Sequence, residues 1–334
     1  MRKKIFFSIL LLALGCRDGN CASWTSTGNM SEGCGGHTAT LLPDGSVLVI
    51  GGTNQYGLPT ASCERYDVAS GTWSTFGTLQ VARHSHAATL LLDGKILISG
   101  GVVTGSTSTS CEIFDPNTQM SVPTGSLTGQ PFYTSFVRLN SGLVLAVNTT
   151  DGGLRLCELF DPGTGLWRTT ASTNAYTYGD ANGILLADGR ALAVGQGTVE
   201  IFDPATETWS SIMFPVPNSG VETAIVLSDG QVLIVLSGPS YKFNPASSTF
   251  SLASPPHERL YHFDVLRQPL VRLQNGTLLA CGAFDRPIDG TVFLLSTCQV
   301  FDPVLDQWLT TQPMRDRKYR HTAIVLNNGR VLTA

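Results

Sequence analysis

The sequence predicts an all-β protein built from a repeated antiparallel unit. Turn-forming residues are abundant, with 35 glycines and 17 prolines among 334 residues, while only 14% of the residues are charged. This composition excludes a disordered chain and a coiled coil. Glycine-containing turns also recur at similar spacing along the chain, and such a period indicates one repeat architecture rather than unrelated domains.

The chain begins with a segment typical of export signals. Residues 2–4 are positively charged, and residues 5–15 form an apolar stretch that is too short to cross a bilayer as a stable helix. Ala13-Leu14-Gly15-Cys16 resembles the lipobox of bacterial lipoproteins, although Ala13 stands where that motif usually has Leu. The alternative is an ordinary cleaved signal peptide in which Cys16 has no role.

The lipobox resemblance implies how the mature protein is anchored. Residues 1–15 would be a removed signal peptide, Cys16 would carry lipid, and residues 16–23 would be a lipidated linker. Arg17 follows the cysteine, at the place where an Asp would favour retention in the inner membrane. We therefore expect an exported protein of the cell envelope that contacts the outer membrane through its lipid anchor alone.

Seven short turns mark the repeated unit. Each turn follows a short apolar run, and consecutive turns lie 41 to 53 residues apart. Asp-Gly and Asn-Gly favour two-residue hairpin turns because both residues tolerate positive φ, and the aliphatic runs after them predict a second strand. The turns are Asp44-Gly45, Asp93-Gly94, Ser141-Gly142, Asp188-Gly189, Asp229-Gly230, Asn275-Gly276 and Asn328-Gly329.

Two further landmarks predict the third and fourth strands of each unit. An aromatic residue followed by Asp or Asn, and in most units by Pro, ends the third strand, because Pro cannot continue a ladder. A large apolar residue about seven places later opens a fourth strand. Four antiparallel strands bury neither face alone, whereas a radial array buries both, so seven units predict a seven-bladed β-propeller. The pairs are Tyr66 and Trp73, Phe114 and Met120, Phe160 and Trp167, Phe202 and Trp209, Phe243 and Phe250, and Phe301 and Trp308.

These landmarks resemble the Kelch repeat, whose signature is a Gly pair after the second strand, then an aromatic residue and a Trp separated by six residues. Gly51-Gly52, Tyr66 and Trp73 match this signature fully, and Gly100-Gly101 begins a partial match. The resemblance covers residues 24–334. It implies one domain, a Kelch-type β-propeller of four-stranded blades.

The two ends of the chain are expected to meet in the last blade. Residues 24–30 have no preceding strands of their own, so we predict that they form the fourth strand of the seventh blade and remove an exposed edge. The last unit has a first strand at 321–326 and a second at 330–333, with no third. The seventh blade is therefore incomplete, either because the reading frame is truncated or because the blade has three strands.

Function is expected on the face that carries the connections from second to third and from fourth to first strands, because these loops are long and varied. The sixth unit has the most elaborate insertions, which contain polar and aromatic residues. They predict recognition of a protein or glycan partner, with a solvated insertion as the alternative. The candidate partner-binding residues are Arg259, Tyr261, His262 and Asp285.

Three histidines near the starts of first strands are weak metal candidates. His37, His86 and His321 fall on blades one, two and seven, which are adjacent, and imidazoles at a channel mouth can bind a metal ion. Similar residues follow each histidine, which favours a repeated structural element instead. We assign no metal, no cofactor and no catalytic residue.

Most cysteines are expected in the core. Four stand three residues before the aromatic residue of a third strand, and a fifth lies in a second-strand run. Cys21 and Cys34 lie near the N-terminal clasp, where a disulfide is possible but its geometry cannot be established from sequence. The five core cysteines are Cys63, Cys111, Cys157, Cys298 and Cys281.

Charge and motifs restrict the function. A formal net charge of −4 argues against nucleic-acid binding. Hydrolase and metalloprotease motifs are absent from the sequence. We expect a monomeric binding scaffold for a protein or glycan partner. The alternative is a copper-radical oxidase resembling galactose oxidase, a family built on a seven-bladed Kelch-type propeller. Residues 259–262, Arg-Leu-Tyr-His, resemble its Tyr-His pair, but a second Tyr, a crosslinking Cys and the remaining His cannot be assigned by motif.

Overall fold

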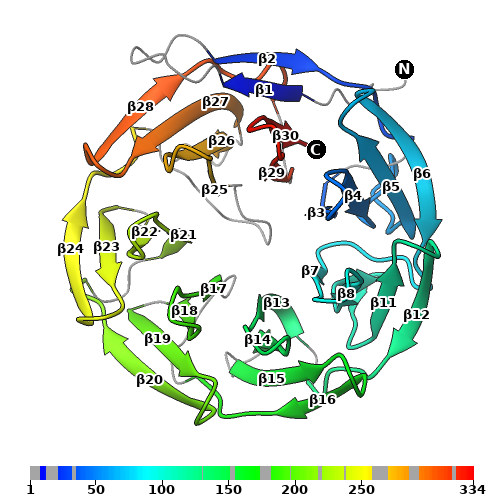
Figure 1. Ribbon diagram of the computed structural model, residues 1–334, viewed down its shortest axis with the longest axis horizontal. Coiled ribbons are helices and arrows are strands. Elements are labelled where there is room, and N and C mark those ends of the chain that lie inside the picture. The colour runs from blue at the N-terminus through cyan, green and yellow to red at the C-terminus, as the bar shows by residue number, and fades with distance from the viewer. Residues whose placement is uncertain are drawn as a thin grey trace.

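The structure, a computed structural model, is all-β and propeller-like. Figure 1 shows its sheets standing around a central opening, with the first strand of each sheet innermost and the fourth outermost. No helix among the described residues is long and apolar enough to cross a membrane. The structure describes residues 8–12, 22–31, 35–129, 131–150, 155–173, 182–195, 197–216, 220–236, 238–257, 270–285, 293–317 and 321–334.

The first two units are four-stranded antiparallel sheets joined at their outer strands by one parallel bridge, Met120 to Thr78. Between the second and third strands of unit 2, a separate two-stranded hairpin contains β9 (Val102–Val103) and β10 (Ser106–Thr107). Unit 1 consists of β3 (Thr38–Leu41), β4 (Val47–Ile50), β5 (Ser62–Asp67) and β6 (Thr72–Thr78). Unit 2 consists of β7 (Ala87–Leu90), β8 (Ile96–Ser99), β11 (Cys111–Asp115) and β12 (Met120–Thr124).

The next four sheets follow the same strand order along the chain. Unit 3 consists of β13 (Pro131–Arg138), β14 (Val144–Thr150), β15 (Arg155–Asp161) and β16 (Leu166–Thr169). Unit 4 consists of β17 (Asn182–Leu185), β18 (Ala191–Gly195), β19 (Thr198–Asp203) and β20 (Thr208–Met213). Unit 5 consists of β21 (Val221–Val226), β22 (Val232–Leu236), β23 (Ser240–Asn244) and β24 (Thr249–Ala253). Unit 6 consists of β25 (Leu270–Arg272), β26 (Leu278–Asp285), β27 (Phe293–Asp302) and β28 (Gln307–Thr311).

Unit 7 combines both ends of the chain. Its strands are β29 (Ala323–Val325), β30 (Val331–Thr333), β1 (Ser8–Leu12) and β2 (Ala22–Ser26), and they pair in that order from the inside outward. The N-terminal clasp thus takes the outer position, as predicted, although its strand is Ala22–Ser26 rather than residues 24–30. The predicted gap in this blade is wrong, because β1 occupies the third position.

The core lies between neighbouring sheets. All four residues of β4 and of β8 are buried, because each second strand is covered on both faces. Ile50 of unit 1 packs in one cluster with Ile96 and Ile98 of unit 2. Within a sheet, Phe202 stands opposite Trp209, with ring centroids 5.1 Å apart. Each sheet therefore depends on its neighbours for burial, as expected of a radial repeat.

The hairpin turns lie where predicted, but their type differs. Gly45 has a φ of 85°, whereas Asp44 is not among the residues with positive φ. The Gly45 amide donates to the Leu42 carbonyl at 2.9 Å, and the Leu42 amide donates to the Ser46 carbonyl at 2.8 Å. This geometry is a three-residue loop, a type I turn followed by a left-handed glycine. Asp44 instead accepts the Ser46 amide through Oδ1 at 2.9 Å, so the predicted two-residue turn is wrong.

Candidate functional site

The three predicted histidines form hydrogen bonds between neighbouring units. His86 Nε2 lies 2.9 Å from Thr38 Oγ1 of unit 1, and His37 Nε2 lies 3.1 Å from Thr322 Oγ1 of unit 7. His321 Nε2 donates to a backbone carbonyl of β26 in unit 6 at 3.1 Å. All three side chains are buried. Each histidine thus links its own first strand to the preceding unit.

The Gly pair of unit 1 makes room for these imidazoles. A Cβ atom at Gly51 would lie 2.6 Å from the Arg83 carbonyl oxygen and 2.9 Å from Cε1 of His86. A Cβ atom at Gly52 would lie 3.0 Å from Cβ of His37. Both glycines also have positive φ. The Kelch-like glycine pair and the histidines therefore act together in packing.

The hydrogen bonds favour the structural alternative for the histidines over metal binding. Burial and the positive charge of Arg83 lower the pKa of His86 to about 3, so its ring is neutral at ordinary pH. Within the described part of the chain, no group of three or more His, Cys, Asp and Glu side chains could hold a metal ion.

A groove on the long-loop face lies between units 1 and 2. One wall is the loop at 57–59, the other is the β9–β10 hairpin at 102–105, and the floor is the connection from β6 to β7. Its volume is about 840 Å³, within the range of about 300–1,000 Å³ typical of ligand sites. The side chains lining it are aliphatic or polar, with one histidine, and include no Asp, Glu, Lys or Arg. They are Leu58, Pro59, Gln80, Val81, Ala82, His84, Val102, Val103 and Thr104.

Two non-glycine residues beside the groove have a left-handed backbone. Thr104 and Gly105 at the tip of the hairpin have φ values of 47° and 87°, the pattern of a type I′ turn. Ser85, next to His84 of the groove floor, has a φ of 54°, and its amide donates to the Gly36 carbonyl at 2.7 Å. Such conformations are costly for β-branched residues and cluster at functional sites. Thr104 therefore marks the hairpin as a candidate contact.

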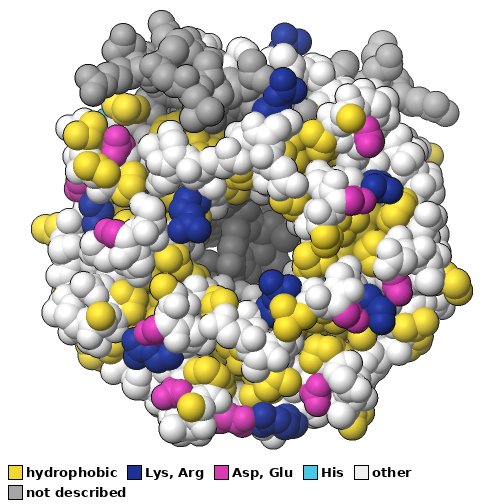
Figure 2. Space-filling view, viewed as in Figure 1, with side chains coloured by type: hydrophobic (Ala, Val, Ile, Leu, Met, Phe, Trp, Pro, Cys, Tyr) yellow, Lys and Arg dark blue, Asp and Glu magenta, His cyan; other side chains and the backbone are white. Residues whose placement is uncertain are grey.

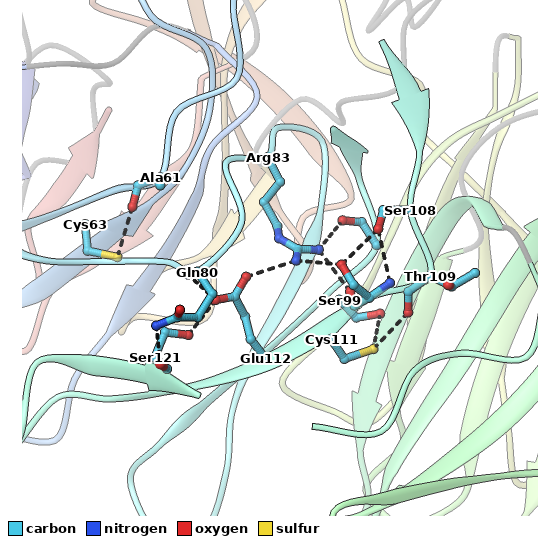
Figure 3. A network of polar contacts seen from close by, with 12 residues as sticks. Ala61, Cys63, Gln80, Arg83, Ser99, Ser108, Thr109, Cys111, Glu112 and Ser121 are labelled. Carbon is cyan, nitrogen blue, oxygen red and sulfur yellow. Dashed lines mark hydrogen bonds and ion pairs between the residues drawn. The ribbon is translucent and has the colours of Figure 1, made fainter. Parts of the chain in front are cut away.

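A buried ion pair, shown in Figure 3, involves Arg83, which stands between the groove-floor residues Ala82 and His84. Arg83 is fully buried, and its Nη2 lies 2.9 Å from Oε1 of Glu112 on β11. Its Nη1 donates to the carbonyls of Gly100 and Ser110 at 2.7 and 3.0 Å. These contacts tie the floor to both strands that flank the β9–β10 hairpin, so they fix one wall relative to the floor.

Glu112 also belongs to a repeated pattern that positions the connections between units. Its Oε2 accepts hydrogen bonds from the backbone amide of Gln80 at 2.7 Å and from the hydroxyl of Ser121 at 2.6 Å. In other units, a Glu or Gln side chain at the corresponding position accepts a hydrogen bond from a backbone amide of the connection between units. These pairs are Ser31 with Glu64 at 2.8 Å, Thr128 with Glu158 at 2.9 Å and His257 with Gln299 at 2.9 Å.

Cys16 and three of the four candidate partner-binding residues lie outside the described residues. Arg259, Tyr261 and His262 fall in 258–269, and the predicted lipidation site Cys16 falls in 13–21. Asp285 is the last residue of β26, where it pairs in register with Phe293 of β27. The described structure therefore does not bring the four candidate residues of unit 6 together or separate them.

The groove was not predicted as a site, although both of its walls fall in loops predicted to be long. A Thr-Gly dipeptide at a hairpin tip is the one local signal that could have drawn attention to it. Figure 2 shows one face of the molecule, on which Lys and Arg are interspersed with Asp and Glu. The lining of the groove itself contains none of these four residue types.

Comparisons with known proteins agree with the fold. Residues 35–80 match the model of the Kelch motif. Among solved structures, the chain is similar to a fungal alcohol oxidase of the AA5 family in complex with copper. That match has a TM-score of 0.74 and 15% identity, and covers 92% of this chain and 71% of the other. A search of curated proteins found no match. The chain thus carries a Kelch motif and shares a galactose-oxidase-like propeller fold, and at this identity the likeness concerns fold alone.

Proposed function

We propose that the chain is a seven-bladed Kelch-type β-propeller that binds a protein or glycan partner on its long-loop face. The four-stranded sheets and the recurring turns support the blade count. Closure of the ring by the N-terminal strand is supported by Trp24, whose Nε1 donates to the Gln312 carbonyl of unit 6 at 3.0 Å. Trp308 of unit 6 makes the same bond to Ser254 of unit 5, also at 3.0 Å.

The groove between units 1 and 2 is the observation that carries the binding proposal. It combines a ligand-sized volume with aliphatic walls and a few polar groups, which is the usual composition of binding sites. Leu58 at its rim is 60% exposed and nearby Tyr56 is 77% exposed. Exposed apolar side chains at the mouth of a groove gain most from a partner that covers them. The lining favours an uncharged part of that partner.

Binding assays with matched variants test this site. Immobilised protein would be tested on a glycan array and against fractionated envelope proteins, and each ligand would be retested with Leu58→Asp and Leu252→Asp. We expect Leu58→Asp to weaken binding by about 1–4 kcal/mol, as at an interface hot spot. Leu252 is 73% exposed on β24 of unit 5, away from the groove, so its variant is the control. Equal binding by wild type and both variants would place recognition elsewhere.

The insertions of unit 6 are proposed as a second contact region on the same face. Arg and Tyr combine large contact area with hydrogen bonding, which makes them frequent hot spots. A variant with substitutions at all four candidate residues, Arg259, Tyr261, His262 and Asp285, should bind the same ligand more weakly. The melting temperature of the protein should not change. Unchanged affinity in this variant would confine recognition to the groove.

We also propose that the protein is exported and lipid-anchored at Cys16. Removal of residues 1–15 would take β1 out of unit 7, so β2 would depend on contacts that do not involve β1, such as that of Trp24 with Gln312. Cys16→Ser should release the protein into the soluble fraction, and mass measurement of the mature N-terminus should show a lipidated Cys16. A mature chain that retains residues 8–12 would contradict signal removal.

A copper-radical oxidase is the second candidate, because a solved alcohol oxidase with bound copper shares the fold. Among the described residues, no group of three or more His, Cys, Asp and Glu side chains could hold a metal ion. Tyr261 and His262, which lie outside the described residues, are the candidate ligands. Metal analysis and a peroxide assay with galactose decide between the two functions. Stoichiometric copper with peroxide release would replace the binding proposal.

A further inference from the structure

Two buried cysteines stand opposite each other on adjacent strands of unit 6. Cys281 of β26 pairs in register with Cys298 of β27. Their side chains are 1% and 0% exposed and belong to the same hydrophobic cluster. Residues directly opposite in an antiparallel pair point to the same face of the sheet. The two thiols therefore lie on one face, side by side.

This placement satisfies the backbone requirement for a disulfide. Opposite residues in antiparallel strands have Cα atoms about 4.5 to 5.5 Å apart. A disulfide needs a Cα separation of about 4.4 to 6.8 Å. The Cα atoms therefore lie in that range, whereas the Cβ atoms, about 4.5 to 5.5 Å apart in such pairs, must approach to about 3.5 to 4.5 Å.

The equivalent cysteines of units 1, 2 and 3 each stand opposite a residue other than cysteine. Burial also raises the pKa of Cys63 to about 12 and that of Cys111 above its usual value, which suppresses the reactive thiolate. The opposed pairs are Cys63 with Ile50, Cys111 with Ser99, and Cys157 with Val147. Unit 6 thus differs from units 1, 2 and 3 in carrying cysteines on both strands.

We propose that Cys281 and Cys298 form a cross-strand disulfide when the protein meets a protein or small-molecule disulfide donor. The thiolate of one cysteine attacks the donor and forms a mixed disulfide, and the second thiolate then displaces the donor sulfur. Two S–H bonds are lost and one S–S bond forms between the Sγ atoms. The S–S bond of the donor breaks, and the two electrons and two protons pass to the donor sulfurs, which leave as two thiols.

The disulfide would fasten the base of the unit 6 hairpin. Beyond Cys281 the register shifts at a bulge, where Gly282 has a φ of 68°, and the pairing then continues to Asp285 and Phe293. A crosslink at this point restricts how the distal hairpin can separate from the sheet. In the cell the proposal rests on the proposed export, because disulfides persist in oxidising compartments.

Peptide mapping of the full chain tests the pairing directly. Purified protein would be incubated with oxidised glutathione in urea below the unfolding midpoint, so that local opening admits the donor. Free thiols would then be alkylated under denaturing conditions before a non-reducing digest. We expect one linked peptide pair containing Cys281 and Cys298, which a reductant separates. Alkylation of both cysteines in separate peptides would overturn the proposal.

Two variants and one cellular sample sharpen the result. Reductant should lower the melting temperature of the oxidised wild-type protein. Cys298→Ala should abolish both this decrease and the linked peptide, whereas Cys157→Ala should preserve both. Persistence of the reductant effect in Cys298→Ala would count against the pairing. Protein isolated from the envelope should already carry the link. If the link forms with glutathione but is absent from cellular protein, the pairing is correct and the proposed export is wrong.

Discussion

The junction between units 1 and 2 can be compared with the junction between units 7 and 1, where the chain ends meet. Both contain a histidine at the start of a first strand that bonds a threonine of the preceding unit, His86 with Thr38 and His37 with Thr322. Both also have a backbone amide held by a carboxylate of the third strand. Repeated sequence positions thus produce the same contacts whether or not the units are consecutive in the chain.

The two junctions differ at the sequence position three residues before the histidine. At the first, Arg83 holds this position before His86 and is paired with the carboxylate of Glu112. In the sequence, Cys34 holds the corresponding position before His37. The arginine therefore distinguishes the first junction from the second. Since the chain neighbours of Arg83 on both sides belong to the groove floor, its ion pair is suited to fixing that site.

Removal of the arginine should have the largest effect on stability. Arg83→Met leaves the Glu112 charge buried without its partner, which typically costs about 3 to 5 kcal/mol. Urea unfolding measures the change in the free energy of unfolding. Arg65→Met removes an exposed pair with Asp44 and should cost at most about 1 kcal/mol. Equal costs for the two variants would show that Arg83 and Glu112 do not form a buried ion pair in the folded protein.

Truncation at the closing strand should have the next largest effect. Trp24 is 5% exposed and packs with Leu279 and Met314, so Trp24→Ala should cost about 3 kcal/mol. Trp209→Ala is the matched control. It removes the same kind of bond, to Ala171 at 2.8 Å, from a half-buried side chain and should cost less. If Trp24→Ala lowers the free energy of unfolding by less than about 1 kcal/mol, the N-terminal strand does not contribute to the fold as described.

The histidine at the junction of units 1 and 2 should make stability depend on pH. The pKa of His86 is about 3 in the folded protein, below its ordinary value of 6.5. Between these values the unfolded chain binds a proton that the folded chain does not. Stability therefore falls as pH decreases from about 6.5 to 3, by about 1.4 kcal/mol per pH unit.

Replacement of this histidine isolates its contribution. His86→Gln keeps a side-chain amide that can bond Thr38 and removes the titrating ring. Burial raises the pKa of Asp44, but hydrogen bonds from Ser46 lower it further, so its pKa lies below the ordinary value. Protonation of such acidic groups reduces the free energy of unfolding at acid pH in both proteins. The difference in slope between wild type and variant, from unfolding curves at pH 4 to 6, should equal the His86 contribution. Identical slopes would mean that the ring takes up its proton without unfolding.

The sequence predicts most of the fold because its signals are local. Gly45 and its counterparts mark hairpins through backbone conformation, and the aromatic pair of Phe202 and Trp209 marks the third and fourth strands through direct cross-strand contact. The sequence also predicts that Trp24 belongs to a fourth strand, because no strands of its own unit precede residues 24–30. The third strand of unit 7 could not be predicted, since residues 8–12 carry the apolar pattern of an export signal.

The candidate site depends on contacts between loops that no local signal records. Leu58 and Val103 face one groove because neighbouring units bring two separate loops together. The partner of Arg83 likewise follows from the position of Glu112 on β11 and not from any motif. Histidines such as His86 were noticed from sequence, but only the hydrogen bond to Thr38 distinguishes packing from ligand binding.

The smallest expected effect separates stability from binding at the groove. Thr104 has a φ of 47° and is followed by Gly105, so Thr104→Asn creates the Asn-Gly pair that a type I′ turn prefers. Because the side chain is exposed, little packing is lost, and the free energy of unfolding should rise by up to about 1 kcal/mol. If Thr104 contacts the partner, affinity should fall in the same variant. Gln119, with a φ of 59° in the turn between β11 and β12, provides the control. Gln119→Asn should bring a similar gain in stability with unchanged binding, and a loss of binding there as well would remove the groove from the explanation.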